Sequence, residues 1–227
     1  MKKDLIQNEK KIVQFSIGRS GSTLAWQILR QIFANVSKAH EKEMREDFNN
    51  KVAFSLVVTQ REPCDNLLSI IKVRRYSNNP ASMEESLDKH VVSNYLGIYK
   101  RKEEILRRYC EDAQLSPLVL KYEEFIDNYD YIFDRLEKYY SIEIDRKRRQ
   151  EMSEVVSIKN NKKIQEQYSC FSQVCNDSGI HGNHINFPYP GDYEKTLKKI
   201  DFDWLREQLD YEINYWKDYW KKARKIV

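Results

Sequence analysis

The chain has 227 residues, of which 41% are hydrophobic and 12% aromatic, and its formal net charge is +4. This length and apolar content allow a substantial core and indicate one domain over residues 1–227. The small net charge does not indicate nucleic-acid binding, and no apolar run reaches membrane-spanning length, so we expect a cytoplasmic protein without a membrane span. The four cysteines form no zinc-ligand pattern with the four histidines, which predicts free thiols and no metal.

The first predicted element is a short strand over residues 12–17, followed by a helix over residues 24–33 whose apolar side chains recur on one face. Between them lies the loop Gly18-Arg19-Ser20-Gly21-Ser22-Thr23. A strand that turns sharply into a helix directs several unpaired backbone N–H groups, and the positive end of the helix, at one point. The loop therefore predicts a binding site for a phosphate or sulfate group.

This loop differs from the common nucleotide P-loop, in which a lysine follows the second glycine. Here Ser22 follows Gly21, and the cation of the loop is Arg19.

The remaining elements alternate between strands and helices. Strands are expected at residues 35–40, 52–60 and 118–122, and helices at about residues 63–73, 82–109, 132–140, 145–167 and 203–224. This order predicts a three-layer α/β/α fold with a mostly parallel central sheet. Ligands of such sheets bind at the carboxyl ends of the strands, where Gly18, His40 and Arg61 lie.

Most glycines fall in two windows, and only Gly97 lies elsewhere. Gly18 and Gly21 belong to the first loop, and Gly179, Gly182 and Gly191 belong to a late segment that we expect to be a loop. Because glycine permits unusual backbone conformations and close approach to a ligand, the two windows predict two sides of one site.

Four stretches of the sequence together resemble the sulfotransferases that use 3′-phosphoadenosine 5′-phosphosulfate (PAPS). The run Arg19 to Thr23 resembles the family's 5′-phosphosulfate loop, and Arg61-Glu62-Pro63 followed by Ser69 resembles its Arg-Asp-Pro motif with the following serine. Lys38-Ala39-His40 is similar to the family's Lys-Thr-His. The run LVLKYE, residues 118–123, is similar to a late strand of the family that ends in Tyr-Glu.

The resemblance implies a P-loop-like sulfotransferase fold and a role for each matched residue. PAPS would be bound by the loop, with Ser22 and Thr23 holding the 5′-phosphate, and by Arg61 and Ser69 at the 3′-phosphate. His40 would be the general base, while Arg19 and Lys38 would neutralise charge on the leaving phosphate. The residues implied at the cofactor are Gly18, Arg19, Ser20, Gly21, Ser22, Thr23, Arg61 and Ser69.

Two positions depart from the family's pattern. Leu24 stands where the family often has an aromatic residue against the adenine, and the late Arg-Lys-Gly segment has no clear counterpart. In its place are residues 179–184 and 190–195, where we expect a loop that covers the cofactor, with His184 or Lys195 in contact with it.

The predicted reaction is transfer of a sulfuryl group from PAPS to a hydroxyl of a small-molecule or carbohydrate acceptor, or to an amine, with release of adenosine 3′,5′-bisphosphate (PAP). Two alternatives stay open. One is a small-molecule kinase that uses ATP and Mg²⁺, against which the missing lysine after Gly21 argues. The other is a nucleotide-binding protein of the same fold without activity. The sequence does not identify the acceptor or the oligomeric state.

Overall fold

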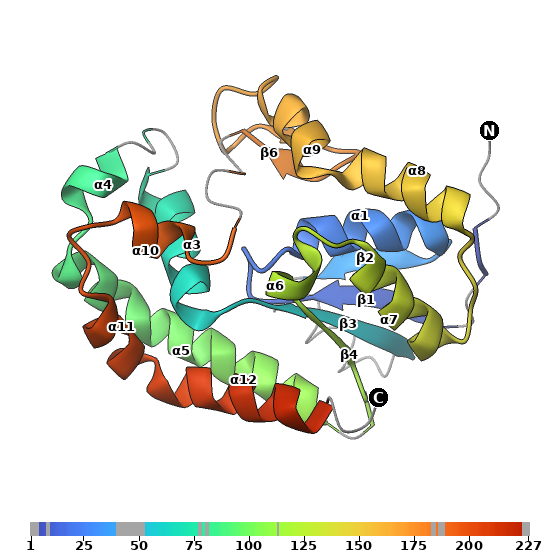
Figure 1. Ribbon diagram of the computed structural model, residues 1–227, viewed down its shortest axis with the longest axis horizontal. Helices are drawn as coiled ribbons and strands as arrows, with labels where there is room; N and C mark the ends of the chain where they lie inside the picture. The colour runs from blue at the N-terminus through green and yellow to red at the C-terminus, as the bar shows by residue number, and fades with distance from the viewer. Residues whose placement is uncertain are drawn as a thin grey trace.

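The computed structural model describes residues 5–7, 10–39, 53–76, 79, 82–112, 114–182, 185 and 189–223. Its centre is a parallel sheet of four strands in the order β2-β1-β3-β4 (Figure 1). The strands are β1 (Lys11–Phe15), β2 (Val36–Ala39), β3 (Phe54–Gln60) and β4 (Leu118–Lys121). Ile12 pairs with Val36, and Val58 pairs with Val119. All four strands therefore end at the same edge of the sheet.

Neighbouring residues of each strand are buried on opposite faces of the sheet. In β3, Leu56 and Val58 belong to one hydrophobic core and Val57 to another, and all three are fully buried. This is the two-residue period of a strand that is covered on both sides. The sequence therefore reads as a continuous apolar run.

Helices cover both faces of the sheet and complete three layers (Figure 1). One core contains residues of α3 (Pro63–Tyr76), α5 (Lys89–Glu111) and α12 (Asp210–Ala223). The other contains residues of α1 (Ser22–Ile32), α7 (Asp130–Tyr140) and α8 (Arg146–Val156). The predicted α/β/α architecture with a parallel sheet is thus confirmed.

Shorter elements connect these layers: α4 (Ser82–Ser86), α6 (Tyr122–Phe125), α9 (Ile158–Gln165), β5 (Val174–Cys175), β6 (Ile180–His181), α10 (Asp192–Thr196) and α11 (Phe202–Gln208). β5 and β6 form a small antiparallel hairpin within the segment that was expected to be a loop. None of the helices that the structure describes is long and apolar enough to cross a membrane.

Three long predicted helices are each divided in two. The prediction from Ser82 to Tyr109 is wrong at residues 87–88, because the Asp88 side chain accepts a hydrogen bond from the Val91 amide at 2.9 Å and starts α5. Ser157 accepts one from the Asn160 amide at 3.1 Å and separates α8 from α9. The last helix is divided between Gln208 and Asp210. In the first two cases an N-cap residue inside the helical pattern starts a new helix.

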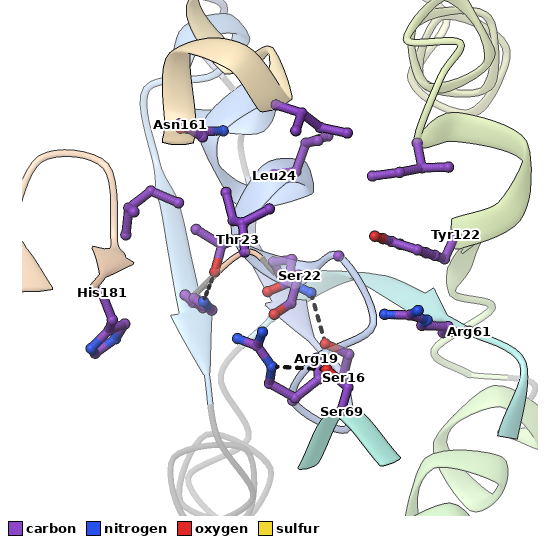
Figure 2. Close-up of a pocket in the computed structure, with 18 of the residues that line it drawn as sticks. Ser16, Arg19, Ser22, Thr23, Leu24, Arg61, Ser69, Tyr122, Asn161 and His181 are labelled. Carbon is purple, nitrogen blue, oxygen red and sulfur yellow. Dashed lines mark hydrogen bonds between the residues drawn. The ribbon is translucent and has the colours of Figure 1, made fainter. Parts of the chain in front are cut away.

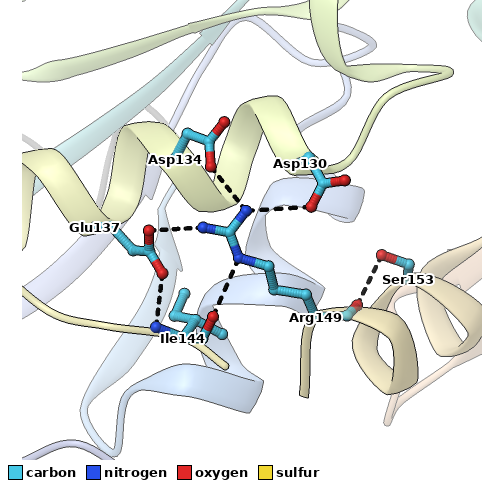
Figure 3. A network of polar contacts seen from close by, with 6 residues as sticks. All are labelled: Asp130, Asp134, Glu137, Ile144, Arg149 and Ser153. Atoms are coloured by element: carbon cyan, nitrogen blue, oxygen red, sulfur yellow. Dashed lines mark hydrogen bonds and ion pairs between the residues drawn. The ribbon is translucent and has the colours of Figure 1, made fainter. Parts of the chain in front are cut away.

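Arg149 joins α7 to α8, which in turn packs against α1. Figure 3 shows its guanidinium among the carboxylates of Asp130, Asp134 and Glu137, at 3.2, 2.7 and 2.6 Å. Its Nε donates to the Ile144 carbonyl at 3.2 Å. The run of four basic residues at 146–149 therefore contributes ion pairs between α7 and α8, through Arg149, as well as exposed positive charge.

We predict that Arg149→Met lowers the free energy of unfolding by about 1–2 kcal/mol near neutral pH, because partly exposed carboxylates lose their partner. Partial burial raises the pKa of Glu137, but hydrogen bonds from Arg149 and the Ile144 amide outweigh it and hold the pKa below its usual value. The contribution is therefore present at neutral pH and lost as the pH falls through this lowered pKa. Urea unfolding of both proteins at neutral pH and at pH ~3.5 measures the loss of stability and its pH dependence. The exposed Arg146→Met serves as a control, and an undiminished difference at the acidic pH would contradict the assignment to Glu137.

Candidate functional site

A cavity of about 210 Å³ opens at the edge where the four strands end (Figure 2). Its wall is formed by the loop between β1 and α1, the ends of β2 and β3, one face of α3, and the start of α6. The hairpin of β5 and β6 contributes the side facing β2. Segments far apart in the sequence thus meet at the edge that the fold predicts for a ligand.

Gly21 starts α1 and allows the loop to approach α6. It has a φ of 81°, in the left-handed region, and is the N-cap of the helix. A Cβ atom at this position would lie 2.6 Å from both the Tyr122 and the Phe125 rings. Only glycine fits here. Ser22 and Thr23, whose first-turn amides have no acceptor within the helix, follow directly and line the cavity.

Two cations, one from the loop and one from β2, make contacts on different sides of it. Lys38, on β2, donates from Nζ to Thr23 Oγ1 at 2.8 Å, and Arg19 donates from Nε to Ser69 Oγ at 3.3 Å (Figure 2). Burial, and then the charge of Arg19, lower the pKa of Lys38 to about 8. Burial also lowers the pKa of Arg19 to about 10, where Tyr193 opposes and Arg61 adds to the shift. Both groups are cationic at neutral pH, and their proximity favours the binding of an anion.

Arg61 lies directly after β3 and is buried, with 4% of its surface exposed. It pairs with Asp65 at 3.5 Å, and its guanidinium lies over the Tyr122 ring at 4.6 Å. Asp65 also accepts a hydrogen bond from the Gly191 amide at 2.9 Å, which ties the late segment to α3. Arg61 is therefore fixed in position on the side of the cavity that Ser69 also lines.

The cavity wall includes most of the residues that the sequence singled out. Those lining it are Gly18, Arg19, Gly21, Ser22, Thr23, Lys38, Arg61 and Ser69. Ser20 does not line it, because its hydroxyl faces the sheet, 3.0 Å from Thr59 Oγ1 and 3.4 Å from the Ile17 carbonyl. His40 and His184 lie outside the described residues, although Ala39, next to His40, lines the cavity.

Sequence reasoning missed a histidine in the hairpin. His181 lines the cavity, its ring stacks on Phe171 at 4.5 Å, and its Nδ1 lies 2.8 Å from the Phe171 carbonyl. Burial lowers its pKa despite that hydrogen bond, and Lys38 and Arg19 lower it further. It is therefore neutral at physiological pH. The cluster of glycines around it was the available signal.

Lys72 and Tyr193 also line the cavity without having been predicted. Lys72 lies one helical turn after Ser69, so its spacing was the signal. Tyr193 is 1% exposed and lies in α10, two residues after Gly191.

The far end of the cavity is apolar. Leu24 and Ile126, which belong to one hydrophobic core, line it there with Ile158, which packs against the same core, and Figure 2 shows Leu24 near Asn161. The cavity thus combines a cationic part with an apolar part. Over the described residues, no group of three or more His, Cys, Asp or Glu side chains is arranged to hold a metal ion.

Compared by sequence, the chain matches no protein-family model and no curated protein. Compared by structure, it is similar to the crystal structure of mouse sulfotransferase SULT7A1 complexed with PAP, with a TM-score of 0.60. The match covers 92% of this chain and 85% of that chain, at 10% sequence identity. The chain has a sulfotransferase fold. At this identity the likeness concerns the fold, and the chemistry must be argued from the residues.

We predict that Gly21→Ala destabilises the protein by roughly 2–4 kcal/mol, because it combines a left-handed backbone with overpacking against two aromatic rings. Gly97→Ala is the matched control: Gly97 lies within α5 and a Cβ there meets nothing within 4 Å. That change should raise the unfolding free energy by about 0.5–1 kcal/mol. Urea unfolding of both variants measures the difference. Equal stabilities would mean that the loop does not need this conformation.

Proposed function

We propose that this protein transfers a sulfuryl group from PAPS to a hydroxyl, or less readily an amine, and releases PAP. The observation that carries the proposal is that one cavity holds two separate sets of anion-binding groups. The first is the start of α1 with Lys38, and the second is Arg61 with Ser69. A ligand with two phosphate groups fits such an arrangement, and the neighbour of the same fold was crystallised with PAP.

The donors suit the separate parts of the nucleotide. Amides at the start of α1, the Thr23 hydroxyl and Lys38 would bind the 5′-phosphate, since a helix N-terminus and an ammonium both favour an anion. Arg61 and Ser69 would bind the 3′-phosphate, because a guanidinium can donate two parallel hydrogen bonds to it. Leu24, Ile126 and Ile158 offer apolar contacts to the purine in place of a stacked aromatic residue.

In this reaction PAPS supplies the sulfuryl group, and the protein positions the two partners and balances charge. Arg19 and Lys38 offset the negative charge that develops on the leaving phosphate. With a pKa of about 8, Lys38 is mostly protonated at neutral pH and becomes less so above it. His40 takes the proton of the acceptor, a role that suits an imidazole near neutral pH.

We further propose a small-molecule or carbohydrate acceptor and a cytoplasmic location. In support of the latter, Cys64, Cys110, Cys170 and Cys175 are all free thiols, which is typical of a reducing compartment.

Thermal unfolding with PAP, beside a matched sample with ATP and Mg²⁺, tests the class of nucleotide. PAP at one hundred times its Kd should add about 2.7 kcal/mol of stability. For a chain of this size this corresponds to a rise in Tm of roughly 5–10 °C. A rise with ATP and Mg²⁺ alone would favour the kinase, and no rise with either would contradict nucleotide binding.

The base is tested separately from the cofactor. We predict that His40→Ala abolishes sulfuryl transfer while the Kd for PAP stays within about twofold, because a general base acts on the acceptor and not on the nucleotide. His90→Ala, on the exposed side of α5, is the control and should retain full activity. Turnover and PAP binding are measured on the same preparations. A fully active His40→Ala would remove this residue from the mechanism.

A further inference from the structure

Lys72 is the least exposed of the cavity's lysines. Only 2% of its surface is exposed, and it is among the largest fully buried side chains, yet it lines the same cavity as Arg19 and Ser69. It lies in α3, three residues after Ser69, so the two side chains share one face of the helix. α3 thus presents a hydroxyl and an ammonium, one turn apart, to the same cavity.

The surroundings of Lys72 are unfavourable to its positive charge in the free protein. Burial, and then the charge of Arg19, lower its pKa to about 7. The other titratable groups of the described residues around the cavity are Lys38 on β2, Arg61 after β3 with its partner Asp65, His181 on β6, and the tyrosines Tyr122 and Tyr193. Keeping an ammonium in such a place costs free energy, which an apolar side chain of the same length would not.

The described residues of α10 supply no cation to the cavity wall. Lys195, the basic residue of α10, is exposed and does not line the cavity, whereas Tyr193 from the same helix does. The Gly191 amide binds Asp65, so it is engaged with α3. Among the described residues, the cations that line the cavity on the side of Arg61 and Ser69 are then Arg19, which contacts Ser69, and Lys72 of α3.

We propose that Lys72 is a phosphate-binding residue, which together with Arg61 and Ser69 binds the 3′-phosphate of the nucleotide. This inference rests on the proposed function. A bound phosphate dianion favours the ammonium form, so nucleotide binding takes up a proton above neutral pH. Affinity for PAP is then highest at or below neutral pH and declines as the pH rises.

Isothermal titration with two nucleotides tests this residue. PAP carries both phosphates, and adenosine 5′-monophosphate lacks the 3′-phosphate. Lys72→Met should weaken PAP binding by about tenfold or more, the effect of losing one charge-assisted hydrogen bond, and leave binding of the monophosphate unchanged. Titration near pH 8 in two buffers of different ionisation enthalpy should show that the variant takes up fewer protons with PAP than the wild type, by up to about one. Lys100→Met, on the exposed side of α5, is the control.

Each outcome decides the matter. Equal PAP affinity in Lys72→Met and wild type would overturn the proposal, and so would equal losses for both nucleotides together with a lowered Tm, which would mark a structural role. If the wild type binds neither nucleotide, the proposed function is wrong. Lys72 is then tested by comparing the Tm of each protein in inorganic phosphate with its Tm in chloride of equal ionic strength. Stabilisation of the wild type but not of Lys72→Met would keep the residue as an anion-binding group. Equal stabilisation of the wild type and of Lys72→Met by phosphate would show that Lys72 is not an anion-binding group.

Discussion

Repulsion between neighbouring cations is the constraint on which the site depends. Four of them line one cavity and come from separate elements: Arg19 from the first loop, Lys38 from β2, Arg61 from the end of β3, and Lys72 from α3. Arg19 lowers the pKa of both lysines, and Arg61 lowers that of Arg19, as neighbouring positive charges do. Such a cluster forms only because burial of apolar residues on both faces of the sheet holds its elements together. The free protein is therefore preorganised for a ligand with several negative charges.

Tyr122 contacts both the first loop and Arg61. Its ring lies against Gly21 of the first loop and also under the guanidinium of Arg61, at 4.6 Å. Phe125, one turn later in α6, packs edge-on against Tyr122 with 5.4 Å between ring centroids and closes on the same glycine. A single aromatic pair after β4 thus sets both the approach of the helix-start loop and the position of the arginine. This gives a physical reason for the tyrosine at the end of that strand in this chain.

The sequence predicted the sheet well, and also the edge at which the cavity opens, because continuous apolar runs and strand-to-helix turns are local signals. Helix ends were less predictable, since Ser82 and Asp88 both offer N-cap side chains and only tertiary packing selects which of them begins the long helix. The site was partly predicted for a similar reason. Lys72 stands among Ile70, Ile71 and Val73, so apolar periodicity does not tell whether it faces solvent or a cavity, and only its spacing from Ser69 indicates the cavity. Ser20 illustrates the reverse case, because pairing of its hydroxyl with Thr59 depends on a strand 39 residues later.

The position of the loop cation explains how charge is divided around the cavity. A lysine after Gly21 would be the first residue of α1, next to Thr23. This chain has Ser22 at that position, and its loop cation is Arg19, whose φ is 76°. The left-handed backbone of Arg19 costs a non-glycine residue about 1–2 kcal/mol. In this conformation the Arg19 side chain donates a hydrogen bond to Ser69 on α3. The cation hydrogen-bonded to Thr23 comes from another element: Lys38 on β2, whose Nζ lies 2.8 Å from Thr23 Oγ1. The exchange of one lysine for an arginine three residues earlier thus links the first loop to α3, and brings Arg19 next to the lysine that α3 buries.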